Sequence, residues 1–508
     1  MNNFTDKLLG AVRSRSALTT ALTALVIAVL VAFNVLIYAL TSLLGLYIYT
    51  PDKDDLSLSG NTDSLFVDAI DRGKEVTVTF CMSEKEVKEH STGSFVYKTA
   101  MGFAERYPEL VKLRFVNFYT HRDDYTGELV DLTKYKTDLR GNETPLRSNT
   151  VIFSSGENYR VVTDHYSGAG FADFFMLDSS GSAYAYVGEE MIASMISWVL
   201  HDEHKTAYLT QNHGETADIA FSNLLACAGY YVDVINLRTS EIPEDAGLVI
   251  ISNPTTDFER GAEVTVYTEI ERLERYLAEG GNLYVALDPY ARRMPVLEGF
   301  LGEWGITVSG EEVDGSYYRE LVKDPVQSTT MNGMTFVAGY ADGEIASVVN
   351  SEASSYRDGG VILREVSRLE VDSALGAEAL LTSSESSVTM LGEQVKDSAG
   401  SYAVAAMSER QTEEGNKARI FVVSGVFLTG TDALVNEGYS NKDFVFSLLN
   451  NLFGSLTAPY GCGSVIYNTG TLQGLTMGTA RVFAAVILAI PAVLAVLGFA
   501  TIIRRKYR

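Results

Sequence analysis

The chain has 508 residues, which is room for two to four domains, and 46% apolar against 21% charged residues is typical of a globular protein. The net charge of −25 argues against nucleic acid as a partner, because a partner of DNA or RNA must neutralise phosphates. Three widely spaced cysteines are too few for a disulfide framework, although two of them could pair: Cys81, Cys227 and Cys462.

Two long apolar runs lie near the ends of the chain. The first has no charged residue between Arg15 and Asp52, and it exceeds the roughly 20 residues that cross a bilayer. The second, between Arg481 and Arg504, is about one bilayer long. A cleaved signal peptide fits the first run less well because of its length, and a buried core helix fits the second less well because the run is continuous. We therefore expect two transmembrane helices.

Charge suggests how such helices would be oriented. Basic residues precede the first run and follow the second, so both termini are expected to be cytoplasmic. Of the 65 acidic residues, 64 lie beyond residue 50, and none lies in 478–508. We expect a protein of the cell membrane with residues 51–477 extracytoplasmic.

After a polar, turn-rich linker over 51–73, residues 74–187 are expected to form a small α/β module. The order is strand, helix, strand and then a hairpin. The elements are Glu75–Phe80, Ser94–Arg106, Lys112–Phe118, and two short strands joined by Gly156-Glu157.

Residues 188–310 read as a second α/β domain. A helix over Gly188–Leu200 is followed by short apolar strands that alternate with helices, which predicts a parallel sheet with right-handed crossovers. Residues 311–460 are predicted as an irregular lobe with closing α/β elements, followed by a linker over 461–480 and the second span and basic tail over 481–508. Whether the irregular part joins the sheet stays open. The closing elements are a strand over Arg419–Leu428 and a helix over Asn441–Leu452.

The common catalytic motifs are missing from the sequence. There is no P-loop and no G-x-S-x-G elbow, and Cys227 falls inside a predicted helix. His201 and His204 lack the spacing that places two imidazoles one turn apart for zinc, and a solvated helix end is expected there. We expect no catalytic residue, no metal site and no cofactor.

The most chemical stretch is "YLTQNHGET", in which His213-Gly214-Glu215 falls between a strand and a helix. Ligands of open α/β sheets bind outside the carboxyl ends of the strands. Other strand ends deliver polar residues to the same edge, which predicts a binding rim of Asn212, His213, Glu215, Asn253 and Asp288. A purely structural loop is the alternative, because Asn and Gly suit a tight turn and a carboxylate suits the first turn of a helix.

The run "VGEEMIASMISWVL", "TAYLTQNHGE", "LVIISNP" and "ERYLAEGGNLYVALDP" resembles the GldG family of auxiliary subunits of ABC-type transport systems. The resemblance implies a thioredoxin-like module and an α/β domain like glutamine amidotransferases, without their cysteine nucleophile, between two spans. Asn212 stands where the family commonly has glycine, and Asn tolerates a left-handed backbone. Ser424-Gly425-Val426-Phe427 stands where the family often has an acidic Asp-Ser-Asp-Phe piece.

The fold expected is therefore α/β: two transmembrane helices flanking an extracytoplasmic region with a thioredoxin-like module and a parallel-sheet, amidotransferase-like domain. The function expected is that of a non-catalytic accessory subunit of an ABC transporter, with a permease, a separate ATPase and the membrane as partners. The alternative is a membrane-tethered envelope enzyme, or a glycan- or small-molecule-binding module, that uses His213 and Glu215.

Overall fold

The computed structural model describes residues 56–59, 62–162, 170–177, 183–261, 267–356, 359–466 and Arg481. Apart from Arg481, the two predicted membrane segments lie outside these ranges. None of the helices within them is long and apolar enough to span a bilayer. The longest of them, α5, has 14 residues, against about 20 for a span. The structure therefore does not support the predicted architecture with two transmembrane helices. Nor does it support the membrane location, the cytoplasmic termini or the extracytoplasmic placement of 51–477, which depended on those helices.

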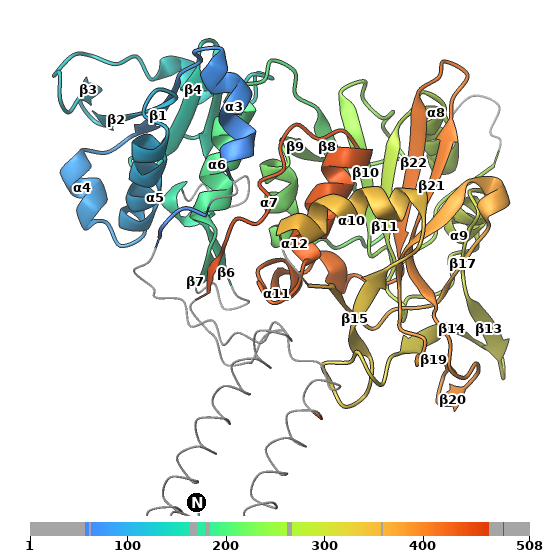
Figure 1. Ribbon diagram of the computed structural model, residues 1–508. Helices are drawn as coiled ribbons and strands as arrows, with labels where there is room; N and C mark the ends of the chain where they lie inside the picture. Colours follow the sequence, from blue (N-terminus) through green and yellow to red (C-terminus); the bar gives the residue numbers. More distant parts are fainter. Residues whose placement is uncertain are drawn as a thin grey trace, which may run out of the picture. The chain divides into compact units, whose positions relative to one another are not determined.

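The first part of the chain forms a five-stranded sheet in the order β3-β2-β1-β4-β5 (Figure 1). Strands β1 and β2 are parallel, and the remaining pairs are antiparallel. The predicted strands, helix and hairpin are confirmed to within a few residues, and Gly156 of the hairpin has a φ of 59°. The strands are β1 (Val76–Phe80), β2 (Val111–Asn117), β3 (Arg122–Asp123), β4 (Val151–Ser155) and β5 (Asn158–Val162). The helices are α3 (Asp63–Asp71), α4 (Glu84–Glu89), α5 (Gly93–Arg106) and α6 (Gly188–Val199).

A strand near the end of the described ranges and two strands that precede α6 form a small antiparallel sheet. Its order is β23-β7-β6, with β6 at Phe175–Leu177, β7 at Ala183–Tyr186 and β23 at Val465–Ile466. Part of the segment predicted as a linker is thus a strand, because β23 pairs with β7.

The main sheet has 11 strands and is mixed. Five strands are parallel in the order β22-β11-β10-β8-β9, and four more continue antiparallel from β22 in the order β21, β18, β15, β16. The irregular stretch therefore belongs partly to the sheet, and the expectation of a parallel sheet describes only about half of it. The parallel strands are β8 (Thr206–Thr210), β9 (Tyr231–Ile235), β10 (Ala246–Ser252), β11 (Asn282–Ala286) and β22 (Lys417–Val423). The others are β15 (Thr335–Tyr340), β16 (Val361–Arg364), β18 (Ala377–Thr382) and β21 (Ala403–Gln411), with β12 (Ile306–Val308) and β17 (Leu369–Val371) beside them.

Helices bury both faces of this sheet. Leu248 and Ile250 of β10 belong to one hydrophobic core, whereas the alternate residues Val249 and Ile251 belong to the other. This explains why the central strands read as continuous apolar runs rather than alternating ones. The first core extends to α3–α6 of the first part of the chain. On the main sheet its helices are α7 (Ile219–Cys227), α10 (Glu344–Tyr356), α11 (Thr431–Leu434) and α12 (Asn441–Ser447). Those of the second are α8 (Glu269–Ala278) and α9 (Pro295–Glu303).

A four-stranded antiparallel sheet completes the fold, with β13 at Gly310–Val313, β14 at Ser316–Lys323, β19 at Val388–Leu391 and β20 at Gln394–Val395. Helix α12 continues as a π-turn over Leu448–Leu452, so the helix predicted over 441–452 is confirmed. The cysteines are free and buried: Cys81, Cys227 and Cys462.

Candidate functional site

The predicted rim loop leaves β8 through a left-handed turn. Asn212 has a φ of 90° and Gly214 a φ of 76°, which confirms that the asparagine adopts the left-handed backbone. Gly214 is also required by space, since a Cβ there would lie 2.1 Å from Oγ1 of Thr255. The turn thus lies against the loop that follows β10, and it directs His213 into the protein.

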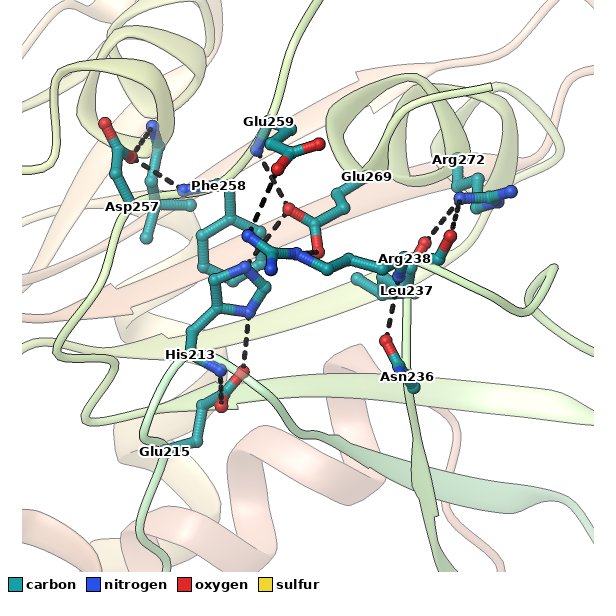
Figure 2. Close-up of polar contacts among 11 residues, drawn as sticks. His213, Glu215, Asn236, Leu237, Arg238, Asp257, Phe258, Glu259, Glu269 and Arg272 are labelled. Carbon is teal, nitrogen blue, oxygen red and sulfur yellow. Dashed lines mark hydrogen bonds and ion pairs between the residues drawn. The ribbon is translucent and has the colours of Figure 1, made fainter. Parts of the chain in front are cut away.

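His213 lies between two carboxylates (Figure 2). Its Nδ1 is 3.2 Å from Oε1 of Glu215, and its Nε2 is 3.1 Å from Oε2 of Glu269. The Glu215 carboxylate also accepts the His213 backbone N–H at 2.6 Å. Both ring nitrogens are therefore engaged, and the His213 side chain is only 1% exposed.

These contacts favour a charged imidazole. Burial alone disfavours the charge of His213, but the hydrogen bonds to Glu215 and Glu269 outweigh it and raise its pKa to about 9. Burial likewise opposes the charge of each glutamate, yet the hydrogen bond from His213 holds the pKa of Glu215 and of Glu269 below its ordinary value. At pH 7 the group is one imidazolium between two carboxylates.

An aromatic ring covers the imidazolium. Phe258 stacks on His213 with ring centroids 3.9 Å apart and an interplanar angle of 9°. A cation over an aromatic face is stabilised by the quadrupole of the ring, and more so where water is excluded. The side chains thus close the imidazole off from solvent at its face as well as at its nitrogens.

Glu269 is the first residue of α8, and a second cation reaches it. Carboxylates are favourable at the first turn of a helix, where backbone N–H groups are free. Arg238 lies 3.4 Å from Oε1 of Glu269 and 3.2 Å from the exposed Glu259. Glu269 also accepts the backbone N–H of Glu259 at 2.9 Å, so it connects α8 to the loop after β10 as well as to His213 (Figure 2).

The loop after β10 is bonded to the His213 loop through the backbone. The His213 carbonyl accepts the N–H groups of Thr255 and Thr256 at 2.7 and 3.0 Å. Asn253, with a φ of 55°, donates its side-chain amide to Oγ1 of Thr216 at 2.8 Å. The two loops therefore form one hydrogen-bonded unit at the carboxyl edge of the sheet.

The structure brings together four of the five predicted rim residues: Asn212, His213, Glu215 and Asn253. Asp288 is the exception, because its carboxylate accepts the N–H of Tyr290 at 2.8 Å and forms its own turn after β11. Sequence reasoning missed Glu269, Phe258 and Arg238. An acidic residue after Thr268 does signal a helix start, but nothing in the sequence connects it to a histidine 56 positions earlier.

A pocket of about 420 Å³ opens beside this unit. It lies at the carboxyl ends of β8, β9 and β10 and against α7, which is where ligands of α/β sheets bind. Glu215 contributes the one ionised group of the lining, and His213 already holds that carboxylate. The polar residues of the pocket lining are Thr210, Gln211, Glu215, Thr216, Ser222 and Ser252, and the apolar residues are Leu209, Ala217, Ile219, Val234 and Ile250.

No cluster of histidine, cysteine and acidic side chains suited to a metal ion occurs in the ranges that the structure describes. The His213 group is unsuitable because a metal-bound imidazole must offer a free nitrogen lone pair. The predicted solvated helix end at "HDEH" is wrong for His204, whose ring stacks on the buried Trp198 with centroids 3.5 Å apart.

No family model matches the chain, and no curated protein matches it. Among solved structures, the chain is similar to the mmIFT52 N-terminal domain at 15% identity and a TM-score of 0.35, with 49% of this chain and 97% of that chain covered. It is similar to a putative ThuA-like protein from Bacteroides uniformis at 12% and 0.29, covering 48% and 88%. PurLQS from Thermotoga maritima matches at 13% and 0.26, covering 50% and 100%. At these TM-scores the likenesses identify neither a family nor a function.

Proposed function

We propose that this protein is a non-catalytic accessory subunit of an ABC transporter, whose α/β domain binds a substrate or a partner group in the pocket beside the His213 loop. Two kinds of observation support the proposal. The run from 188 to 289 resembles the GldG family of transporter auxiliary subunits, and the pocket lies at the sheet edge that α/β proteins use for ligands.

The observation that carries the non-catalytic part is the double engagement of His213. A histidine that acts as general base needs a free ring nitrogen and a pKa near the working pH. Here both nitrogens contact carboxylates, and the pKa is raised to about 9. Such an imidazolium holds two loops and a helix together, and it has no lone pair with which to remove a proton.

The energy for transport has to come from another subunit. The sequence has no P-loop, so an ATPase partner would bind and hydrolyse the nucleotide. A permease would form the pathway for the substrate. In this scheme the present chain supplies recognition or coupling.

Affinity purification tests the proposal. The tagged full-length protein is recovered from its native host in mild detergent, and quantitative mass spectrometry identifies the proteins that accompany it. We expect an ABC ATPase and a multi-span permease in stoichiometric amounts, absent from a purification of an unrelated protein with the same tag. Recovery of the intact, abundant protein without either subunit would overturn the proposal.

A second candidate function, a small-molecule-binding module outside any transporter, is favoured by the pocket itself. Its volume of about 420 Å³ suits a small ligand. The variant Ser222→Trp places a large side chain in the pocket from α7, and Ser240→Trp is an exposed control. In a transporter subunit, Ser222→Trp reduces transport while the ATPase and permease still copurify. In a separate binding module, Ser222→Trp no longer restores the phenotype of a strain that lacks the protein, although neither an ATPase nor a permease copurifies with the native protein.

A further inference from the structure

A second pocket, of about 350 Å³, lies between the edges of the two large sheets. Strand β5 ends the five-stranded sheet, and β9 ends the 11-stranded sheet. The loop over 138–145 closes the third side. This pocket shares no lining residue with the one beside His213, so the two are separate sites.

A residue that lines this pocket carries an unpartnered hydroxyl. Tyr231 lines it and is 7% exposed, and its buried hydroxyl makes no hydrogen bond within the described part of the chain. Buried polar groups in folded proteins nearly always have a partner. The ring of Tyr231 is itself held in place, since Trp198 packs edge-on at 5.5 Å and the Arg140 guanidinium lies 4.0 Å from the ring centroid. The hydroxyl therefore lacks a partner, and a ligand in the pocket reaches it only when a neighbouring side chain of the lining, such as that of Arg140, moves aside.

The pocket also carries a cation without a carboxylate. Arg160 of β5 donates to the carbonyls of Ala226 and Tyr230 at 3.3 and 3.2 Å, and no acidic side chain pairs with it among the residues described. Burial, the largest influence, lowers the pKa of Arg160 because the charge is poorly solvated, although the guanidinium also lies 5.0 Å from the ring centroid of Trp198. Arg160 and Tyr231 are thus two groups that an incoming carboxylate would satisfy.

The pocket lining has more carboxylates than guanidinium groups. Arg140 is already shared between Asp138 at 3.3 Å and Asp233 at 3.6 Å. The exposed Glu143 lines the pocket and has no side-chain ion pair in the described ranges. After these pairings one guanidinium and at least one carboxylate remain, which is the arrangement that a ligand with both charges would complete.

We propose that this pocket binds a small zwitterion of the α-amino acid type. The ligand carboxylate pairs with the Arg160 guanidinium and accepts the hydroxyl of Tyr231. The ligand ammonium lies near the carboxylates of Glu143 and Asp233. The volume of the pocket is within the range of small-molecule sites, at its lower end.

Isothermal titration calorimetry of the purified full-length protein tests this. Each of the twenty common L-amino acids is titrated, followed by the N-acetyl and amide forms of any that bind. We expect at least one free amino acid to bind with a Kd below about 1 mM. Its N-acetyl form lacks the ammonium and its amide form lacks the carboxylate, so each is expected to bind at least about tenfold more weakly.

Two variants locate the site. Tyr231→Phe removes only a hydroxyl that makes no hydrogen bond to any residue that the structure describes, so the fold is retained and the affinity falls about three- to tenfold. Arg160→Gln reduces the affinity by about tenfold or more. The matched controls are Tyr318→Phe and Arg260→Gln, at residues that do not line the pocket, and they leave the affinity unchanged. The proposal fails if no amino acid binds below about 10 mM, or if the binding is the same in Tyr231→Phe and Arg160→Gln as in the native protein.

Discussion

His213 and Glu269 are 56 residues apart in the chain, and Nε2 of the histidine lies 3.1 Å from the carboxylate of the glutamate, with both side chains buried. This contact joins the loop after β8 to the start of α8. Together with the contact to Glu215, it gives the His213 loop a structural role. The group of His213, Glu215 and Glu269 is called the clamp below.

Removal of one charge from the clamp is expected to destabilise the fold. In Glu269→Gln the buried imidazolium loses one of its two counter-charges, and the free energy of unfolding is expected to fall by about 3 kcal/mol. Urea denaturation at pH 7 measures it. The matched control is Glu259→Gln, because Glu259 also pairs with Arg238 but is 65% exposed. We expect that variant to change the stability by less than about 0.5 kcal/mol, and equal losses in the two variants would contradict the account.

Alkaline pH is expected to weaken the protein through His213. The pKa is about 9 in the folded protein against an ordinary value of 6.5, so the folded state holds a proton that the unfolded state releases. This stabilisation is complete below pH 6.5 and is lost as the pH rises through 9. We expect the loss to be about 3 kcal/mol over that window. The variant His213→Gln, measured by urea denaturation at the same pH values, should lack this part of the slope, and a native protein with the same slope as the variant would refute the prediction.

The left-handed turn before His213 is expected to distinguish alanine from glycine at position 212. With a φ of 90°, Asn212→Ala introduces a residue that disfavours this backbone, at a cost of about 1 kcal/mol. Asn212→Gly should be neutral or slightly stabilising, since glycine adopts the turn without strain. Thermal denaturation compares them with Gln211→Ala, an exposed neighbour whose φ is not positive. Equal stability of the alanine and glycine variants would show that the turn is not strained.

The native thiols are expected to be inert. Cys81, Cys227 and Cys462 are buried, and burial raises the pKa of Cys81 to about 12 and those of the other two as well. Because the thiolate is the reactive form, a disulfide reagent such as Ellman's should find almost no thiol in the native protein and all three after denaturation. The exposed variant Ser240→Cys is a positive control. Rapid modification of a native cysteine would mean that its surroundings open readily.

The parts that could be predicted from sequence are those with local causes. Strand β1 and helix α5 follow from apolar periodicity, and the turn at Asn212 follows from residues that tolerate a left-handed backbone. The union of the antiparallel strands with the parallel ones could not be predicted, because β22 pairs not only with β21, its neighbour in the chain, but also with β11, from which the irregular stretch separates it. No local pattern encodes that second pairing.

The residues of the candidate site could likewise be predicted from the sequence only where their contacts are local. Glu215 lies two residues from His213, so its role was within reach of the sequence. Glu269 meets His213 only because β10 and α8 place it there, and local pattern carries no information on that meeting. Asp288 was expected at the rim because it follows a strand, but its carboxylate bonds to its own turn instead.

The charge state of His213 is the most direct test of the account. Long-range ¹H–¹⁵N NMR of the protein labelled with ¹⁵N-histidine, with His213→Gln to assign the signal, reports whether both ring nitrogens carry protons. We expect the His213 ring to be doubly protonated at pH 7.5 and to titrate near pH 9. A neutral ring at pH 7.5, with one unprotonated nitrogen, would contradict it and would restore His213 as a candidate general base.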